Sequence, residues 1–304
     1  MRHLISILEL ERRGVSALLD TAERFRDGEV PRLSGVIGLL FLAASTRTRV
    51  GFEVAAYRLG LNVAALVQTK SDSGMSASES LLDTIRVVSG YVDALCVRCS
   101  NDEIGAVALA AAHCPVVNCG MGHAEHPTQA LADLFTIRTL RGGIDGARVA
   151  IIGDLAHMRA AHSLLLALAL FDDVDVCCIA PPQLGMPAKY ARLFVARGHT
   201  LKSSDKLDPR AFDFVYVAGF PARAHDDDYS PAIRQRFAIT YEVAARLPVG
   251  TAVLCPLPRI DEIDPSVDEL PVAQYFLQSD LALWTRMAVL ECIHSQGRSA
   301  QPKG

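Results

Sequence analysis

The sequence has no excess of basic residues and no apolar run long enough to cross a membrane. Its 30 Lys and Arg against 34 Asp and Glu give a formal net charge of −4, so the chain as a whole does not attract phosphate backbones or anionic lipid. The N-terminal stretch MRHLISILELERRG interrupts its apolar residues with Glu and Arg, and no run approaches the roughly 20 apolar residues of a transmembrane helix. We therefore expect a cytoplasmic protein that binds neither nucleic acid nor membrane, with any anionic ligand held by a local set of donors.

Low-complexity segments and the dinucleotide-binding glycine fingerprint are also missing. Apolar residues make up 50% of the chain and charged residues 21%, a composition that excludes disorder and supplies material for buried cores. No G-x-G-x-x-G follows the first predicted strand of either half, which argues against a plain dinucleotide-binding protein. The length of 304 residues suits two domains of about 150 residues each.

The eight cysteines allow a metal-site interpretation and a simpler one. Cys96-x-x-Cys99 with Cys114 and Cys119 could be arranged as four zinc ligands. However, four of the eight cysteines lie in the apolar runs DALCV, VDVCCIA and AVLC, which are typical of buried strands. A thiol in such a run behaves as a small hydrophobic side chain. We therefore predict no metal site.

Apolar runs of strand length alternate with segments of helical period along the chain. In the first half, the predicted strands are GVIGLLFLA, LNVAALV, DALCVR and PVVNCG, and the predicted helices cover residues 45–60, a segment from residue 79, 101–113, and a segment from Pro127 to about Arg141. In the second half, the strands are ARVAIIGD, VDVCCIA, FDFVYVAG and AVLCPLP, with helices over about 157–171 and 187–197, another reaching about residue 246, and a last one over about 272–294. This order predicts an α/β protein of two domains, each a parallel sheet flanked by helices.

The pair Gly142-Gly143 marks the predicted boundary between the two domains. We expect a first domain over residues 1–142 and a second over residues 143–271. The closing helix comes after the second sheet is complete, so we expect residues 272–296 to fold back and complete the first domain. Ligands of such sheets bind at the carboxyl ends of the strands, where helix N-termini present free N–H groups.

A cluster of hydroxyl and guanidinium groups follows the first predicted strand. The pentapeptide Ser45-Thr46-Arg47-Thr48-Arg49 would place three hydroxyls in the first turn of a helix. Hydroxyls and backbone N–H groups donate to phosphate oxygens, and a planar guanidinium can bind phosphate through two hydrogen bonds. The pentapeptide is therefore either an anion cradle or an ordinary helix cap with exposed arginines, and alone it does not decide between them.

Three separated motifs resemble those of the aspartate/ornithine carbamoyltransferase family, above all its aspartate carbamoyltransferase catalytic chains. Residues 41–60, FLAASTRTRVGFEVAAYRLG, resemble the first motif, and residues 126–135, HPTQALADLF, resemble the second. Residues 255–259, CPLPR, resemble the third, which in the family usually begins with His. Order and spacing also match, and the resemblance extends through SLLDTIR, YVDALCVR, VAIIGDL and the closing helix, so it covers nearly the whole chain.

The resemblance implies a carbamoyltransferase, in which an amino acid's amine attacks the carbamoyl carbon of bound carbamoyl phosphate and phosphate leaves, without a metal or organic cofactor. It implies these contacts to carbamoyl phosphate: Ser45, Thr46, Arg47, Thr48 and Ser73 on the phosphate, Arg98 and His126 on the carbonyl oxygen, and Gln129 with the backbone carbonyls of Pro256 and Leu257 on the NH2 group. Arg47, Thr48, Arg98 and His126 would be the catalytic residues, because donors aimed at developing charge stabilise the transition state. Arg159 would bind the α-carboxylate of the acceptor.

Five further positions depart from the family pattern, and most of them concern the acceptor. They are Ala77 for a loop lysine, Ala156 for a lysine beside Arg159, Gly219 for the arginine that pairs with the side-chain carboxylate of aspartate, Pro221 for a glutamine, and Ala43 for a glutamate linked to domain closure. A dicarboxylate needs compensating cations in a partly desolvated pocket. Aspartate is therefore a doubtful acceptor, unless Arg223 or Lys70 substitutes from a shifted position. The family's cysteine motif for ornithine is resembled only loosely.

Two hypotheses follow from the pattern. The first is an active carbamoyltransferase for an aspartate-like or altered acceptor, and the second is a catalytically impaired paralogue with a structural or regulatory role in a complex. The resemblance also implies a homotrimer with shared active sites, because the loop that carries Ser73 reaches the neighbouring subunit in the family. Other subunits remain possible partners.

Overall fold

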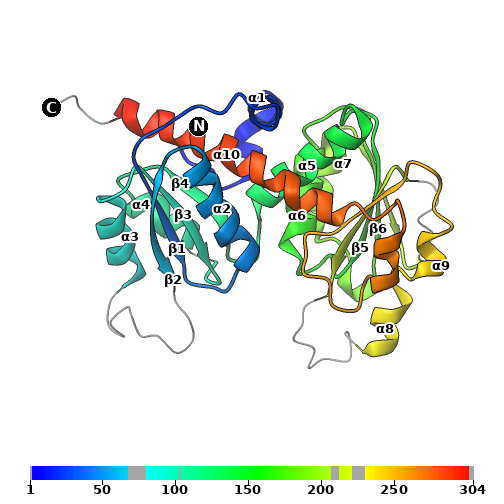
Figure 1. Ribbon diagram of the computed structural model, residues 1–304. Coiled ribbons are helices and arrows are strands. Elements are labelled where there is room, and N and C mark those ends of the chain that lie inside the picture. Colours follow the sequence, from blue (N-terminus) through cyan, green and yellow to red (C-terminus); the bar gives the residue numbers. More distant parts are fainter. Residues whose placement is uncertain (1, 68–79, 103, 207–211, 221–229, 301–304) are drawn as a thin grey trace. The chain divides into compact units, whose positions relative to one another are not determined.

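The computed structural model describes residues 2–67, 80–102, 104–206, 212–220 and 230–300 (Figure 1). The chain divides into two compact units. Unit 1 comprises residues 1–131 and 282–304, and unit 2 comprises residues 132–281. Each unit contains one parallel sheet with helices packed on it (Figure 1), so the predicted fold class is confirmed. The domain limits at residues 142 and 271 stay a prediction.

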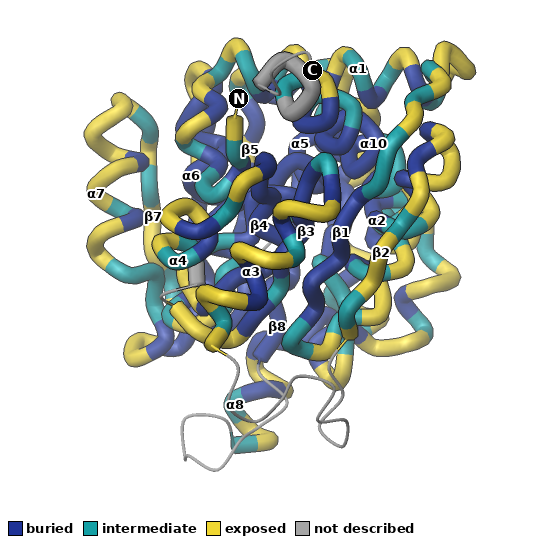
Figure 2. The backbone as a smooth tube through the Cα atoms, turned by 90° about the vertical axis from the view of Figure 1, so that its left-hand side faces the viewer, coloured by how far each residue is buried: buried dark blue, intermediate teal, exposed yellow. Residues whose placement is uncertain are grey.

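Unit 1 contains a four-stranded sheet with the order β2-β1-β3-β4. Its elements are η1 (Ile7–Leu10), α1 (Glu11–Arg26), β1 (Val36–Phe41), α2 (Thr46–Arg58), β2 (Asn62–Val67), α3 (Leu81–Ser89), β3 (Ala94–Cys99), α4 (Ile104–Ala111), β4 (Val116–Met121), the start of α5 (Pro127–Arg141) and most of α10 (Tyr275–Ala300). Strands β1, β3 and β4 are almost wholly buried, whereas the edge strand β2 is exposed or half-buried along its length (Figure 2). The chain runs from β1 to β2 on one side and then to β3 on the other. The strand order therefore reverses between β1 and β3, the place where open α/β sheets bind ligands.

Unit 2 contains a five-stranded sheet with the order β7-β6-β5-β8-β9. Its further elements are β5 (Arg148–Gly153), α6 (Arg159–Leu168), β6 (Asp175–Ile179), η2 (Pro182–Leu184), α7 (Ala188–Ala196), β7 (Thr200–Ser204), β8 (Phe214–Gly219), α8 (Pro231–Arg236), α9 (Tyr241–Ala244), β9 (Ala252–Leu254) and η5 (Pro265–Glu269). Here the strand order reverses between β5 and β8. Buried side chains from β5, β6, β8 and β9 form one apolar core.

All eight predicted strands are present, but three features of the fold differ from the expectation. Strand β7 was not predicted, because its sequence TLKSS is polar and the strand lies at an edge where it is largely exposed. Helix α1 was also not predicted, although its buried residues recur at helical spacing. The helix expected to reach residue 246 is wrong within the described residues: two short helices form there, because Ser230 and Thr240 each accept a hydrogen bond from a backbone N–H and start a separate helix.

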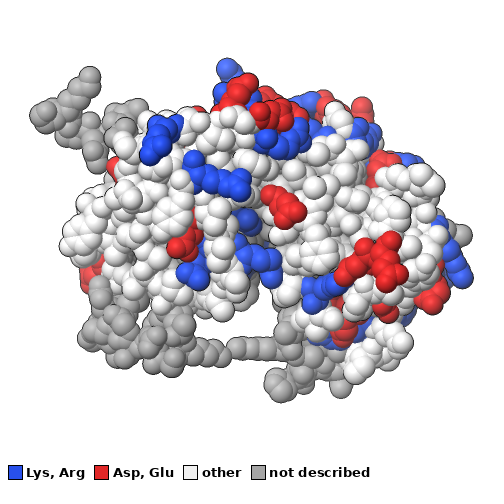
Figure 3. All heavy atoms as spheres, viewed as in Figure 1, with Lys and Arg blue, Asp and Glu red and all other residues white. Residues whose placement is uncertain are grey.

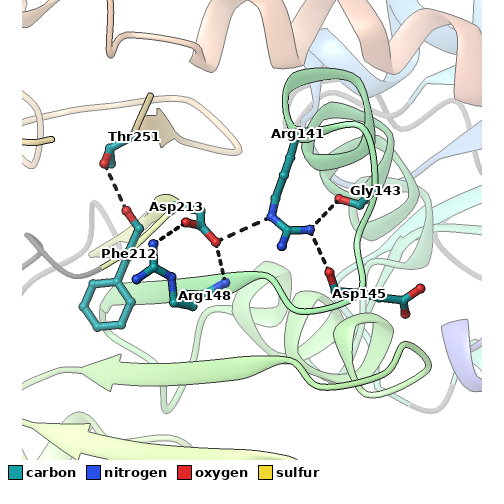
Figure 4. Close-up of polar contacts among 7 residues, drawn as sticks. All are labelled: Arg141, Gly143, Asp145, Arg148, Phe212, Asp213 and Thr251. Carbon is teal, nitrogen blue, oxygen red and sulfur yellow. Dashed lines mark hydrogen bonds and ion pairs between the residues drawn. The ribbon is translucent and has the colours of Figure 1, made fainter. Parts of the chain in front are cut away.

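The turn between α5 and β5 is fixed by polar contacts within unit 2 (Figure 4). Nη1 of Arg141 donates to the carbonyl oxygens of Gly143 and Asp145 at 3.3 and 2.7 Å. Nε of the same side chain lies 3.6 Å from Oδ2 of Asp213, whose other oxygen accepts from Nη2 of Arg148 at 2.6 Å. Arg141 therefore ties the glycine-containing turn to the start of β8.

Seven of the eight cysteines are buried, as expected for apolar strands, and Cys292 is half-buried. Burial raises the pKa of Cys114 and of Cys178 to about 12, which keeps both thiols protonated and unreactive at neutral pH. In the described part of the chain, no three His, Cys, Asp or Glu side chains come together as metal ligands. No described helix is long and apolar enough to cross a membrane.

Candidate active site

The predicted anion cradle lies at the N-terminus of α2, directly after β1 in unit 1. Ser45 occupies the N-cap position with an extended backbone (φ −165°), but its side chain makes no capping hydrogen bond. The hydroxyl is therefore not used as an ordinary helix cap. Thr48 is buried, whereas Thr46 and Arg47 are exposed. Arg49 pairs with Glu53 at 3.5 Å one turn along the same helix, which separates it from the cradle. The N-terminal N–H groups and Arg47 form an arrangement suited to an anion.

Arg98 reaches the cradle from the neighbouring strand. It stands beside Phe41 in the register of β1 and β3. Its Nε donates to the carbonyl oxygen of Ala44 at 3.2 Å, and its Nη1 donates to the carbonyl oxygen of Cys119 at 3.3 Å. The guanidinium thus connects the segment that leads into α2 with strand β4. The register of the sheet and the hydrogen bond to Ala44 therefore bring Arg98 to the segment just before Ser45, at the switch point between β1 and β3. The role of Arg98 in catalysis, which the family resemblance implies, stays a prediction.

His126 and Gln129 lie where the chain enters α5 after β4. His126 is 9% exposed, and its Nδ1 lies 3.3 Å from Oγ1 of Thr128. Its carbonyl oxygen accepts from the N–H of Gln129 and of Ala130 at 3.0 and 3.2 Å. Gln129 is half-buried. These contacts fix the first turn of α5, at the carboxyl edge of the same sheet that carries the cradle.

Sequence reasoning missed one cation in this part of unit 1, Arg286 of α10. The side chain is 9% exposed. Burial and the positive charge of Arg47 lower its pKa to about 10, and the Cys119 thiol acts in the opposite direction. A usable signal was present in the sequence, because Arg286 is the single charged residue between Asp280 and Glu291. A lone charge in an apolar helical stretch indicates a buried, and often functional, cation.

Arg159, the predicted acceptor residue, begins helix α6 of unit 2, just beyond the carboxyl end of β5. The turn before it is held by Asp154, which is fully buried. Its Oδ1 accepts from the N–H of Ala156 and of His157, each at 3.1 Å. Both carboxylate oxygens also lie within 3.1 Å of Nδ1 of the largely exposed His157. The Asp154–His157 pair was not predicted, although the sequence G-D-L-A-H directly after a strand carries it.

Gly219 ends β8, beside the end of β5, and its backbone conformation favours glycine. Its φ is +81°. A Cβ atom at this position would lie 3.1 Å from Cδ of Glu262 and closer still to Oε1. Glu262 is 2% exposed, and its Oε2 accepts from the N–H of Ile260 and of Asp261 at 2.9 and 3.0 Å. The space that a side chain would need at residue 219 is therefore occupied by a buried carboxylate.

Pro256 and Leu257 follow β9, the last strand of unit 2. The N–H of Cys255 donates to Oε1 of Gln278 at 2.8 Å. Leu257 has a φ of +50°, a conformation that residues other than glycine rarely adopt and that is concentrated at functional sites. The next residue but one, Arg259, pairs with Asp268 and lies 3.0 Å from the Tyr275 hydroxyl.

Several residues of the sequence argument lie outside the described residues. They are Lys70, Ser73, Ala77, Pro221 and Arg223. Among the described positions, Ala156 is half-buried in the turn before α6 and Ala43 is half-buried after β1. On the face viewed in Figure 3, acidic and basic side chains are interspersed, in line with the small net charge.

Comparison with known proteins finds relatives that match nearly the whole chain. Residues 2–139 match the model of the carbamoyl phosphate binding domain of aspartate/ornithine carbamoyltransferases, and residues 145–293 match the model of the aspartate/ornithine binding domain. The chain is 38% identical over 297 residues to an aspartate carbamoyltransferase catalytic subunit from Archaeoglobus fulgidus, covering 95% of this chain and 98% of that protein. A catalytic subunit from Methanocaldococcus jannaschii is 35% identical over 302 residues, covering 96% and 97%.

Solved structures give the same result. A catalytic subunit of aspartate transcarbamoylase from M. jannaschii superimposes with a TM-score of 0.90 at 33% identity, covering 99% of this chain and all of that one. An aspartate transcarbamoylase from Trypanosoma cruzi in complex with carbamoyl phosphate has a TM-score of 0.87 at 31% identity, with 95% and 94% covered. The chain therefore belongs to the aspartate/ornithine carbamoyltransferase family.

Proposed function

We propose that this protein transfers the carbamoyl group of carbamoyl phosphate to the amine of an amino acid and releases phosphate. The observation that carries the proposal is the junction of Ser45, Arg47 and Arg98 at the switch point of the unit 1 sheet, where Arg98 Nε lies 3.2 Å from the Ala44 carbonyl oxygen. Such a set of helix N–H groups, hydroxyls and guanidinium groups suits a phosphate ester. The family relationship supports carbamoyl transfer as the type of reaction.

The reaction needs donors at two places where negative charge develops. As the amine nitrogen bonds to the carbamoyl carbon, charge builds on the carbonyl oxygen, and Arg98 and His126 stabilise it there. The bond from that carbon to the phosphate oxygen then breaks, its electron pair leaves with the phosphate, and the phosphate takes up the proton that the attacking amine loses. Ser45, Thr46, Arg47 and Thr48 hold this phosphate together with Ser73. Gln129 and the carbonyls of Pro256 and Leu257 orient the carbamoyl NH2. Donors placed in advance stabilise this transition state more than the ground state.

The acceptor is an amino acid whose α-carboxylate pairs with Arg159. Gly219 has no side chain and so supplies no cation for a second carboxylate. A Cβ at this position would meet the buried Glu262. Ala156 also lacks a charge. We therefore expect weaker use of aspartate than of an acceptor with a smaller or less acidic side chain. The alternative is a catalytically impaired paralogue that serves in a complex, and the same departures support it.

The first experiment is calorimetric titration of the full chain with carbamoyl phosphate, followed by a phosphate-release screen over amino acids and small amines. We expect saturable binding, and release that depends on one or a few amines. Binding without release for any amine would favour the impaired paralogue. Absence of binding by a folded protein would refute the carbamoyltransferase proposal.

We also propose that the protein assembles as a homotrimer with active sites at subunit boundaries. This follows from the family relationship and from Ser73, which lies outside the described residues. Sedimentation velocity at micromolar concentration tests it, with a trimer mass as the expected result and a monomer as the contradicting one. Mixing a Ser73→Ala chain with an Arg98→Gln chain then tests whether active sites are shared. If they are shared, hybrid trimers contain some sites with both Ser73 and Arg98 and regain activity. If each site is formed by one chain alone, the mixture stays inactive.

A further inference from the structure

Arg286 is a buried cation whose environment does not resemble that of a structural arginine. Its guanidinium Nε has no hydrogen-bond partner, and the residue is 9% exposed. Within the described parts of the chain, no Asp or Glu forms an ion pair with it. A buried arginine that only supports a fold is normally paired and hydrogen-bonded, because an uncompensated buried charge destabilises the folded state.

The guanidinium of Arg286 packs against the first turns of α2. A Cβ atom at Gly51 would lie 2.8 Å from Cζ and 3.1 Å from Cδ of Arg286, and closer still to Nη1. The absence of a side chain at Gly51 therefore provides the space that the Arg286 side chain occupies. Glycine is the least favourable residue after proline inside a helix, so its presence in the middle of α2 is explained by the close approach of Arg286. Gly51 lies one helical turn after Arg47.

The charged surroundings of Arg286 are those of the cradle. The positive charge of Arg47 lowers the pKa of Arg286, whereas the Cys119 side chain raises this pKa. The backbone carbonyl of the same Cys119 accepts from Arg98. Arg47, Arg98 and Arg286 therefore gather around the switch point between β1 and β3. A group of cations of this kind matches a phosphate carrying two negative charges.

We propose that Arg286 is a positioning residue of the phosphate site, whose buried charge is balanced by the phosphate group of the bound substrate together with Arg47 and Arg98. This inference rests on the proposed function, because it takes the cradle as the site of a phosphate-bearing substrate. Arg286 holds α10 against α2, and bound phosphate relieves the repulsion between Arg286 and Arg47. Ligand binding therefore strengthens the contact between the two helices.

The proposal makes a prediction that a structural role does not share. Replacing a buried, unpaired charge by an apolar side chain of similar length removes a cost from the ligand-free protein. We expect Arg286→Met to unfold at the same or a higher temperature than the wild type without ligand. We also expect its dissociation constant for inorganic phosphate to rise by roughly 10- to 100-fold, from the loss of one cation in a poorly solvated site. Arg286→Lys keeps the charge and should bind phosphate with an intermediate affinity.

Arg58→Met is the matched control. Arg58 also joins α2 to α10, since its Cζ lies 5.1 Å from the centre of the Trp284 ring, but it is exposed. Its replacement removes one positive charge and one contact between the same helices. We expect its phosphate affinity to stay within about twofold of the wild type, because exposed charges are screened by water and salt.

A second test leaves Arg286 in place. Gly51→Ala puts a methyl group into the space of the guanidinium and should weaken phosphate binding while favouring the helix itself. In the Arg286→Met background, Gly51→Ala should have no further effect on phosphate affinity, because the two residues act through one contact. Additive effects of the two substitutions on phosphate affinity would count against the proposal.

The measurements are thermal unfolding of the full chain with and without inorganic phosphate, calorimetric titration with phosphate, and the KM values for carbamoyl phosphate and the acceptor. The expected result is a higher KM for carbamoyl phosphate in Arg286→Met with the acceptor KM within about threefold of the wild type. A lower unfolding temperature of ligand-free Arg286→Met with unchanged phosphate affinity would overturn the inference alone. Wild-type protein that binds neither phosphate nor carbamoyl phosphate would overturn the proposed function as well.

Discussion

Gly219 and Glu262 exclude a side chain from the end of β8, because a Cβ atom on Gly219 would lie 3.1 Å from Cδ of the buried Glu262. The φ of +81° adds a second obstacle, since residues with a Cβ pay roughly 1–2 kcal/mol in that region. The departure from the family pattern at residue 219 is therefore built into the surrounding structure. It cannot be reversed by one substitution without a loss of stability.

We expect Gly219→Ala to lower the free energy of unfolding by about 1–3 kcal/mol, from backbone strain and displacement of Glu262. Gly219→Arg should lower the free energy of unfolding by a similar amount. The new arginine would nevertheless supply the cation for a second carboxylate and lower the KM for aspartate. Urea unfolding and aspartate-dependent phosphate release measure the two effects. An unchanged free energy of unfolding in Gly219→Ala would show that the Glu262 side chain moves aside without a loss of stability.

Arg98 combines a catalytic position with two hydrogen bonds to backbone carbonyls, those of Ala44 and Cys119. We expect Arg98→Met to reduce kcat/KM by about 100- to 1000-fold, the usual loss when one donor to a developing oxyanion is removed. Arg49→Met is the control, because Arg49 lies in the same motif but pairs with Glu53. Its activity should stay within about threefold of the wild type. Comparable losses in both variants would mean that general charge, not the position of Arg98, matters.

Gln278 links two parts of unit 2 through a single buried amide. Its Nε2 donates to Oδ1 of the fully buried Asp133 at 2.6 Å, and its Oε1 accepts from the N–H of Cys255 at 2.8 Å. We expect Gln278→Leu to lower the free energy of unfolding by about 2–5 kcal/mol, because a carboxylate and an N–H group lose their partner in a buried site. The control is Gln274→Leu, whose amide donates to Pro271 at the surface. Equal stabilities of the two variants in urea unfolding would refute this assignment.

Much of the architecture could be predicted from the sequence because the central strands are buried on both faces. Runs such as VIGLLF and ARVAIIG are apolar without interruption, as parallel strands are. Strand β7 escaped for the opposite reason, since its polar sequence reflects an exposed sheet edge. The two helices α8 and α9 were merged because their separate N-caps, Ser230 and Thr240, act through hydrogen bonds that hydrophobic periodicity does not reveal.

The candidate site likewise contains some residues that could be predicted from the sequence and others that could not. The pentapeptide at Ser45 stands out in the sequence by its hydroxyl and guanidinium groups after a strand, whereas Arg98 was indicated by the resemblance to the family. The roles of both stay predictions. Arg286 and Glu262 could not be found by that route, because their importance depends on contacts with Gly51 and Gly219, far away in the chain. A glycine in a sequence shows that a side chain is missing, but only the structure shows which other group uses the space.

Asp213 should make the stability of unit 2 depend on pH in the acid range. Burial of its carboxyl group disfavours ionisation, but the hydrogen bonds from Arg148 and the charges of Arg148 and Arg141 outweigh this and lower its pKa (Figure 4). A carboxyl group with a lower pKa in the folded state stabilises the protein above its ordinary pKa of about 4. This contribution is lost as the pH falls through the lower, folded-state value.

We expect Asp213→Asn to lower the free energy of unfolding by about 1 kcal/mol at pH 7, the size of a half-exposed ion pair with added hydrogen bonds. The difference from the wild type should shrink below about pH 4, where the unfolded carboxyl takes up its proton, and disappear once the folded-state carboxyl is protonated as well. Urea unfolding at several pH values measures it. Asp175→Asn serves as the control, because Asp175 is exposed at the start of β6 and forms no hydrogen bond or ion pair through its side chain with the described residues. A difference between Asp213→Asn and wild type that persists unchanged at pH 2 would show that shape, and not charge, makes Asp213 stabilising.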